Sequence, residues 1–233
     1  MCYNSKNIFW RNFRLKERKK IIYIDVDGTL LDFKSIDGCI ISEIFTGNKL
    51  IKFIDKILWW INDLDMVGYS NFIFYTRMTI YSLLSLKNIK RVLKKYKELY
   101  SKYAKKQIST KLKNDLTELE NNHYRIFMVT RNMYANCMSD FLNIPIIIVK
   151  NKNTFYSKLY NSYNISFIVG NNYMDDIVSC YLLNRQYRKH SVKKEVTPIY
   201  IGKSKIVKQI AKENTICFEK IEDFINYLKN MVN

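Results

Sequence analysis

The sequence of 233 residues contains few of the residues that interrupt regular structure, and few histidines. It has only two prolines and six glycines, which excludes a linker-rich or disordered chain. Its two histidines, His123 and His190, lie far apart, which argues against a histidine-rich zinc site and against a Ser-His triad. The length and the 48% hydrophobic content predict one substantial core, or a core domain with a smaller insert.

Long hydrophobic runs and paired cysteines are missing too. The longest apolar runs, such as ILWWI at 57–61, are far too short to span a bilayer. No long apolar stretch follows the basic N-terminus, so a signal peptide is not expected. The five cysteines are scattered and form no CxxC pair, which predicts reduced thiols in a cytoplasmic protein.

Acidic residues are outnumbered, with 21 Asp and Glu against 39 Lys and Arg, for a net charge of +18. This charge favours an anionic partner: a phosphorylated small molecule, nucleic acid or an anionic membrane surface. Residues 1–20 form a basic N-terminal leader that also holds Phe9, Trp10 and Phe13. We expect its aromatic side chains to rest on the core, with contact to an anionic surface or nucleic acid as the alternative.

Short apolar runs predict the fold class. Five runs rich in β-branched and aromatic residues are nearly continuous rather than alternating, as in strands covered on both faces: 21–26, 124–130, 144–150, 165–170 and 197–202. Helical patterns fill the gaps between the later runs, at 131–142, 153–162 and 174–187, and a last short run at 215–218 precedes another helix. The alternation predicts an α/β fold with a Rossmann-like parallel sheet and helices on both sides.

The segment 33–107 breaks this rhythm and predicts an α-helical insert. One expected helical face consists of Leu50, Ile54, Ile57, Ile61 and Leu64. A narrow seam of the kind that packs in helical bundles consists of Leu86, Ile89, Leu93, Tyr96, Tyr100 and Tyr103. Residues 87–113 also hold eleven basic residues, which we interpret as a solvated face, with a basic rim that attracts substrate as the alternative. The core then comprises 21–32 and 108–233.

Two carboxylates, Asp25 and Asp27, stand where the first predicted strand ends. Ligands bind at the carboxyl ends of strands in an open parallel sheet, and Gly28 permits the turn that would bring both side chains to one crevice. Asp-Gly pairs are also common in plain turns, so the pair alone does not specify a site. The longer string DVDGTLLD, residues 25–32, resembles the signature motif of the haloacid dehalogenase superfamily of phosphohydrolases.

The family's second motif is an apolar strand that ends in Thr or Ser. RIFMVTRN matches it and implies that Thr130, followed by Arg131, binds the substrate phosphate. A competing match, NFIFYT, ends at Thr76 but would add a strand and place a very long helix inside the core. Thr130 is therefore favoured, and Thr76 is assigned to the insert.

The third motif is a lysine that offsets the charge of nucleophile and phosphate. Lys150, Lys152 and Lys158 are candidates, and Lys152 is best placed, just before the helix that precedes the next strand.

The fourth motif, an apolar strand followed by Gly-Asp and a further acid, is matched by FIVGNNYMDD at 167–176. Asn171 stands where the family has Asp, which removes one negative charge and is expected to weaken metal affinity. Asp175 fits the shorter spacing of the further acid, and Asp176 fits the longer one.

The resemblance implies a phosphatase that uses Mg²⁺ to hydrolyse a phosphate monoester of a small metabolite. Asp25 would attack phosphorus to form an aspartyl-phosphate, and Asp27 would serve as acid and base. The metal ligands would come from Asp25, Asp27 and Asn171 together with Asp175 or Asp176. The insert lies where the family has a helical (C1-type) cap, which would close over the site and select the leaving group.

Two other functions fit the same residues. A phosphotransferase or phosphomutase would use the same scaffold and differ only in its cap. A binding protein with weakened or lost catalysis would use its basic insert to hold an anion or nucleic acid, which Asn171 and the net charge favour. The intact pair of Asp25 and Asp27 argues against this, and Asp27 also argues against a dehalogenase, since a halide leaves without a proton.

Overall fold

The computed structural model describes residues 19–62, 71–162, 164–212 and 214–232, and most of the N-terminal leader therefore lies outside the described residues. Six strands form one sheet in the order β3-β2-β1-β4-β5-β6, and every neighbouring pair is parallel. The strands are β1 (Lys20–Asp25), β2 (Tyr124–Thr130), β3 (Ile146–Ile148), β4 (Ile165–Gly170), β5 (Thr197–Ile201) and β6 (Ile216–Phe218). All five predicted strands are present, and the short run at 215–218 supplies the sixth at the edge.

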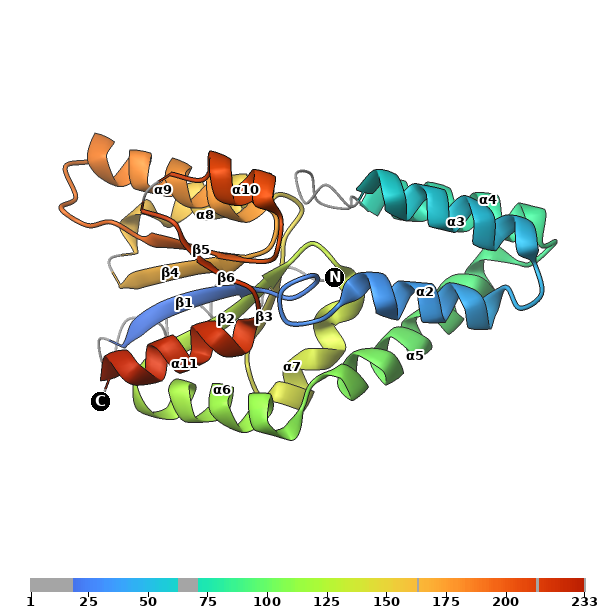
Figure 1. Cartoon of the computed structure of the whole chain (residues 1–233), viewed down its shortest axis with the longest axis horizontal. Helices are drawn as coiled ribbons and strands as arrows, with labels where there is room; N and C mark the ends of the chain where they lie inside the picture. The colour runs from blue at the N-terminus through green and yellow to red at the C-terminus, as the bar shows by residue number, and fades with distance from the viewer. Residues whose placement is uncertain (1–18, 63–70, 163, 213, 233) are drawn as a thin grey trace, which may run out of the picture.

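Helices cover both faces of this sheet (Figure 1). One face carries α6 (Thr110–Asn122), α7 (Cys137–Leu142) and α11 (Ile221–Val232), and the other carries α8 (Lys152–Ser157), α9 (Val178–Lys189) and α10 (Lys205–Ile210). Single turns of other helix types adjoin them: η2 (Met133–Asn136), η3 (Lys158–Asn161) and the π-type turn η4 (Tyr173–Ile177). The α/β class expected from the alternation of strands and helices is confirmed.

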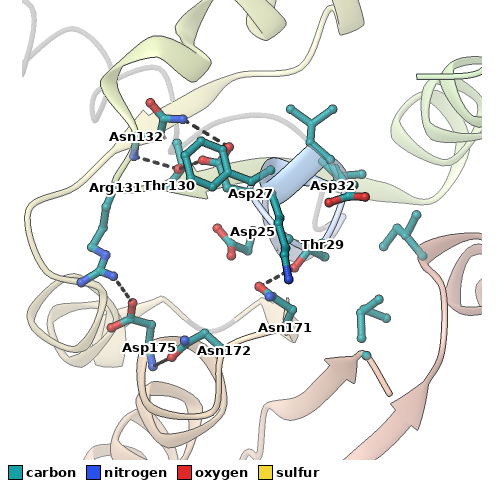
Figure 2. Close-up of a pocket in the computed structure, with 18 of the residues that line it drawn as sticks. Asp25, Asp27, Thr29, Asp32, Thr130, Arg131, Asn132, Asn171, Asn172 and Asp175 are labelled. Atoms are coloured by element: carbon teal, nitrogen blue, oxygen red, sulfur yellow. Dashed lines mark hydrogen bonds and ion pairs between the residues drawn. The ribbon is translucent and has the colours of Figure 1, made fainter. Parts of the chain in front are cut away.

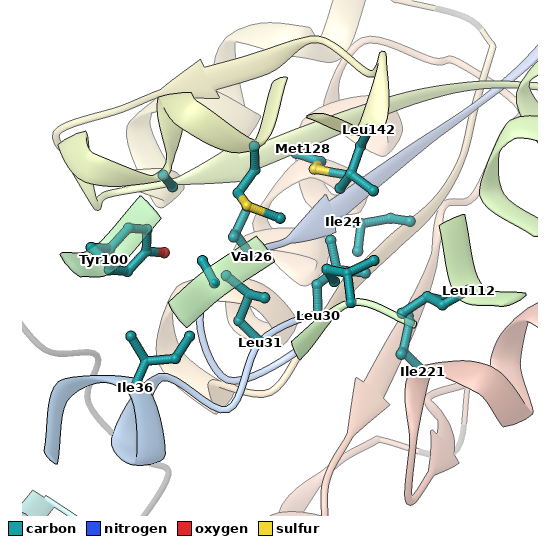
Figure 3. Close-up of a cluster of buried hydrophobic side chains, with 14 of the residues drawn as sticks. Ile24, Val26, Leu30, Leu31, Ile36, Tyr100, Leu112, Met128, Leu142 and Ile221 are labelled. Carbon is teal, nitrogen blue, oxygen red and sulfur yellow. The ribbon is translucent and has the colours of Figure 1, made fainter. Parts of the chain in front are cut away.

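The core has two sides because successive side chains of a strand point to opposite faces. In β1, Ile22 and Ile24 belong to the larger apolar cluster, whereas Ile21 and Tyr23 belong to the cluster under α8 and α9. Figure 3 shows the larger cluster, in which helical side chains pack around the end of β1. Both faces of the sheet are covered, so these strands are apolar at nearly every position. Burial of one such aliphatic side chain stabilises the fold by roughly 1.5–3 kcal/mol.

The described part of the insert, between β1 and α6, consists of four helices: α2 (Phe33–Ile44), α3 (Lys49–Asn62), α4 (Asn71–Leu84) and α5 (Ile89–Gln107). They lie together to one side of the sheet, with α3 and α4 (cyan) along the outer edge in Figure 1. Thr76 lies within α4, so the string NFIFYT is helical and belongs to the insert. A parallel-sheet core with a helical insertion is therefore the observed architecture.

Buried polar side chains join the helices of the insert. The carboxylate of Asp37, which is fully buried, accepts hydrogen bonds from Arg77 Nη2 at 2.6 and 2.7 Å, from the Tyr96 hydroxyl at 2.5 Å and from Trp59 Nε1 at 3.1 Å. Arg77 Nε also lies 3.6 Å from a carboxylate oxygen of Asp55 on α3. A buried charge is tolerated only when it is paired and hydrogen-bonded, so this cluster specifies how the four helices meet.

The structure corrects the predicted helical faces of the insert. Leu50 and Ile57 were expected to face inward, but they are 54% and 42% exposed, whereas Ile51 is fully buried. Leu86 was placed on the bundle seam, but it is 95% exposed and precedes Asn88, whose side chain caps the start of α5. The apolar side of α3 is broader than the part of it that packs, so helical spacing alone did not identify which of its apolar residues are buried. Leu64 lies outside the described residues.

Candidate active site

Three adjacent strands deliver polar residues to one pocket at their carboxyl ends. Strands β1, β2 and β4 end at Asp25, Thr130 and Gly170, and the loops that follow them line a cavity of about 480 Å³ (Figure 2). β1 lies between β2 and β4 in the sheet, where the connections run off in opposite directions. This is the position at which open parallel sheets bind ligands.

The turn after β1 brings Asp27 back to the pocket beside Asp25. Gly28 has a φ of 88°, and its N–H donates to the Leu31 carbonyl at 2.7 Å, while the Leu30 N–H donates to the Val26 carbonyl at 3.0 Å. A Cβ at Gly28 would collide with the side chain of Asn171. Glycine is thus required here both for its backbone conformation and for the close approach of the loop after β4.

Lys152 is held between two carboxylates. Its Nζ lies 2.6 Å from Oδ1 of Asp25 and 2.7 Å from Oδ1 of Asp176. All three side chains are nearly or fully buried. The second oxygen of Asp176 accepts the Asn172 N–H at 3.2 Å, and a Cβ at Gly170 would collide with this carboxyl group. The ammonium therefore links the end of β1 to the turn after β4.

Burial dominates the ionisation of this group. It raises the pKa of Asp25 to about 6 and that of Asp176 to about 7, although Lys152 opposes both shifts. Burial opposes the charged form of Lys152 as well, but the carboxylates of Asp176 and Asp25 outweigh it and raise the pKa of the ammonium. Two carboxylates thus share one cation in a site largely screened from water.

Asp27 is held by three donors. Its Oδ1 accepts from the Tyr100 hydroxyl at 2.7 Å and from Asn132 Nδ2 at 3.2 Å, and its Oδ2 accepts from the Thr130 hydroxyl at 3.1 Å. Burial raises the pKa of Asp27, and these hydrogen bonds work against the rise. The carboxyl group therefore has a fixed orientation, and its proton affinity is higher than that of an exposed Asp.

The loop after β4 completes the rim. Asn171 Oδ1 accepts a long hydrogen bond from the Thr29 hydroxyl at 3.4 Å, and Asp175 pairs with Arg131 Nη2 at 2.8 Å. Asn172 Oδ1 accepts the Asp175 N–H at 2.9 Å and orders the turn. Figure 2 shows Asp25, Asp27 and Asn171 on one side of the cavity, with the Arg131–Asp175 pair across from them.

All of the predicted site residues except Asp176 line the pocket. Pocket-lining positions are occupied by Asp25, Asp27, Thr130, Arg131, Lys152, Asn171 and Asp175. Asp176 lies behind Lys152 and does not line the pocket, and the alternative lysines, Lys150 and Lys158, are exposed elsewhere. Sequence reasoning missed Asn132, although it follows Thr130 by two residues. It also missed Tyr100, which no local pattern could connect to Asp27 because it comes from α5.

The oxygen donors of the pocket are of the kind that a hard cation prefers, but few of them are carboxylates. Asp25 and Asp27 carry carboxylates and Asn171 an amide oxygen, the oxygen donors that Mg²⁺ prefers. Two buried carboxylates, Asp25 and Asp176, contact the single ammonium of Lys152. In the part of the chain that the structure describes, no group of three or more His, Cys, Asp or Glu side chains could hold a metal by itself. A cation here would therefore rely on the Asn171 amide, backbone oxygens and water.

The solved structures similar to this chain include two of phosphoserine phosphatase. A phospho-aspartyl intermediate analogue of phosphoserine phosphatase aligns with 91% of this chain and 99% of its own, at a TM-score of 0.52 and 17% identity. Phosphoserine phosphatase in the apo form aligns with 90% and 98%, at a TM-score of 0.48 and 17% identity. No protein-family model and no curated protein matches the sequence. The first likeness shows that the chain shares the fold of phosphoserine phosphatase.

We predict that Lys152→Met lowers the free energy of unfolding by about 3–5 kcal/mol, because it leaves Asp25 and Asp176 buried without a countercharge. Urea denaturation at neutral pH measures this loss. In a double-mutant cycle, Asp176→Asn should recover part of it, so that the double variant loses less than the sum of the two single variants. Lys158→Met, at an exposed lysine nearby, is the matched control and should change stability by less than about 0.5 kcal/mol. Strict additivity in the cycle would contradict the shared role of Lys152.

Proposed function

We propose that the protein is a Mg²⁺-dependent phosphatase that hydrolyses a phosphate monoester of a small metabolite. The observation that carries the proposal is the meeting of Asp25 and Asp27 in one pocket beside the ammonium of Lys152 and the hydroxyl of Thr130. Two carboxylates with different surroundings suit a reaction that needs both a nucleophile and a proton carrier. The fold shared with phosphoserine phosphatase supports the same reaction class.

The first step would be attack of an Asp25 oxygen on phosphorus. The bond from phosphorus to the ester oxygen breaks, an aspartyl-phosphate forms, and the proton of Asp27 passes to the leaving oxygen to release an alcohol. Burial favours the protonated form of Asp27 that this step requires. Lys152 and Arg131 would bind the phosphoryl oxygens, and the Thr130 hydroxyl would turn from Asp27 to the phosphate once Asp27 carries a proton.

The second step would be hydrolysis of the aspartyl-phosphate. Asp27, now a carboxylate, takes a proton from a water molecule, whose oxygen attacks phosphorus and displaces the Asp25 oxygen as inorganic phosphate forms. The Tyr100 hydroxyl and the Asn132 amide hold Asp27 in the same orientation through both steps. The insert contributes Tyr100, so its position over the core matters to the chemistry as well as to access.

Mg²⁺ would supply positive charge to offset the carboxylates and the incoming phosphate dianion. We propose Asp25, the backbone carbonyl of Asp27 and the Asn171 amide oxygen as its ligands, with Asp175 next to them on the rim. Asp176 is the less suitable of the two acids considered for this role, since both of its oxygens are engaged by Lys152 and by the Asn172 N–H. Mg²⁺ usually keeps several water ligands, so a set with few carboxylates is sufficient.

The proposed division of the chain is into the leader, the core and the insert at 33–107. The insert would act as the cap that selects the leaving group. Its described side chains on the pocket are mostly aromatic: Phe33, Lys34, Trp59, Phe74, Tyr75 and Tyr96. The Phe74 ring lies 4.9 Å from Tyr96 and 5.4 Å from Tyr75 between centroids, and Phe33 lies 5.8 Å from Trp59. We propose that the leaving group contains a planar ring that packs on this wall.

The reaction is tested with p-nitrophenyl phosphate and Mg²⁺. Asp25→Asn should lower kcat at least about a thousandfold, because the nucleophile is lost. Thr130→Val should lower it about a hundredfold, since one donor to the phosphoryl group is removed.

Two matched controls keep this assay specific. Asp140→Asn, at an exposed site on α7, and Thr76→Val, at the competing motif match on α4, should both retain full turnover. Release of p-nitrophenol in excess of inorganic phosphate, in the presence of an alcohol, would reveal phosphotransfer instead of hydrolysis. If the unchanged protein turns over none of a broad panel of phosphate esters, the alternative function, a binding protein without catalysis, becomes the better interpretation.

Asn171→Asp should tighten Mg²⁺ binding at least about tenfold, because ligand charge sets the affinity of such sites. Isothermal titration calorimetry measures this without turnover. In a chelator, the same variant should unfold at a lower temperature, since it adds a negative charge beside Asp25 and Asp27. Asn136→Asp, which adds the same charge at an exposed position, is the control. Equal Mg²⁺ affinity in all three proteins would contradict Asn171 as a ligand.

The aromatic wall predicts selectivity for aryl over small aliphatic esters. Tyr75→Ala should raise KM for p-nitrophenyl phosphate about fivefold, the value of one aromatic contact, and leave KM for acetyl phosphate unchanged. Tyr103→Ala, a tyrosine of the insert that does not line the pocket, should change neither value. A parallel rise in KM for both substrates would place Tyr75 in a general rather than a ring-selective role.

A further inference from the structure

The large apolar side chains that the structure leaves exposed are concentrated in the insert. Those of α3, α4 and the turn after α4 are Leu50, Phe53, Ile57, Phe72, Ile73, Tyr75, Ile80, Leu83, Leu84 and Leu86. Several are extensively exposed: Leu86 is 95% exposed, Phe72 79%, Leu83 70% and Phe53 62%. We call this set the α3–α4 face. The two helices contact each other through the Tyr81 hydroxyl and Asp55, and they lie together at the outer edge of the insert in Figure 1.

A helix that buries apolar residues on its inward side rarely also exposes apolar residues on its outward side. On α3, Ile51 is fully buried and Leu58 packs against the core, while Leu50 and Phe53 point to solvent. A surface helix of a monomeric protein normally has a polar outer side. Exposed apolar residues gathered in one region mark a surface that another molecule covers.

The charges on the α3–α4 face have one sign. Lys49, Lys52 and Lys56 alternate with the exposed apolar residues of α3, and Lys87 and Lys90 follow α4. Across 49–59 and 72–90, where the structure describes side chains, Asp55 is the one acidic residue, and it is buried against Arg77 and Tyr81. The face therefore combines large apolar groups with lysines and presents no exposed carboxylate within these two ranges.

We propose that the α3–α4 face docks on an anionic membrane surface. Apolar side chains with interspersed lysines fit the boundary between acidic headgroups and acyl chains, where each group finds a matching environment. The contact is peripheral, since no described helix is long and apolar enough to cross a bilayer. A second copy of the chain is the weaker candidate, because a two-fold interface would set these lysines against each other with no carboxylate of the face to pair with them.

Docking of this face has a consequence for the pocket. Trp59 on α3 and Phe74 on α4 line the pocket from the same two helices whose outward sides form the face. Membrane binding would therefore hold the pocket next to the lipid surface. Of the residues in the face, Tyr75 also lines the pocket, and the others do not. The inference does not depend on the proposed catalytic activity, because it rests on the exposure and charge of the outward sides of α3 and α4.

Vesicle co-sedimentation of the full chain tests the proposal. The protein should sediment with vesicles of phosphatidylcholine mixed with phosphatidylserine, far less with phosphatidylcholine alone, and less as salt is added. Replacing Phe53, Phe72 and Leu83 together by Ser should weaken binding about tenfold or more. Replacing Lys49, Lys52 and Lys56 together by Ala should weaken it on the order of 100-fold.

Each variant has a matched control on the core. Ile206, Ile210 and Met231 are also exposed, at 51%, 42% and 55%. Their joint replacement by Ser should leave binding within about twofold, because they lie outside the face. Replacing the exposed Lys158, Lys193 and Lys208 by Ala removes the same net charge and should also have little effect, since charges act within about 8 Å at physiological salt.

Circular dichroism and urea denaturation establish that all four variants fold. The proposal is overturned if the protein does not sediment with the acidic vesicles, or if the variants of the face bind as their controls do. It is also overturned if analytical ultracentrifugation reveals a dimer that the Phe53, Phe72 and Leu83 variant abolishes, because the face would then join two copies. Duplex DNA binding that needs the lysines but not the apolar residues, without vesicle binding, would assign the face to nucleic acid.

Discussion

The ammonium of Lys152, buried between Asp25 and Asp176, is the interaction on which the geometry of the pocket depends. It joins Asp25, the last residue of β1, to Asp176 in the turn after β4. These residues are 151 positions apart in the sequence and come together only because β1 and β4 are neighbours in the sheet. Each carboxylate would be costly to bury without this partner, and removal of one member of such a group leaves the others uncompensated. Gly170 makes the arrangement possible, because any side chain there would occupy the space of the Asp176 carboxyl group.

A second constraint ties the insert to the core. The Tyr100 hydroxyl on α5 donates to Asp27, while Thr130 and Asn132 approach the same carboxyl group from the end of β2. The larger apolar cluster is continuous from the sheet into the helices of the insert, so this contact has a packed support on both sides. The orientation of Asp27 is therefore a property of the two parts together, and a shift of α5 would disturb the pocket without touching the sheet.

The distribution of charge explains how a strongly basic protein can have an acidic pocket. Four of its carboxylates are buried in ion pairs. Asp25 and Asp176 pair with Lys152, and Asp37 and Asp55 pair with Arg77. The surface is left correspondingly rich in lysine. A net charge of +18 cannot by itself distinguish among anionic partners. The exposed apolar residues that lie among the lysines of α3 are the reason for proposing a membrane surface, because an anion alone would not require them.

Local pattern was enough to predict the parallel sheet, its strands β1 to β5, the helical insertion and the pair Asp25 and Asp27, because side-chain periodicity and a motif at a strand end are properties of neighbouring residues. It also ranked Lys152 above the other two lysines. It could not indicate that Tyr100 reaches Asp27 or that Asp176 turns away from the pocket. It also could not indicate which part of the apolar side of α3 packs against the rest of the protein. Those outcomes depend on which segments meet across long stretches of chain, and only the packing of the whole molecule decides them.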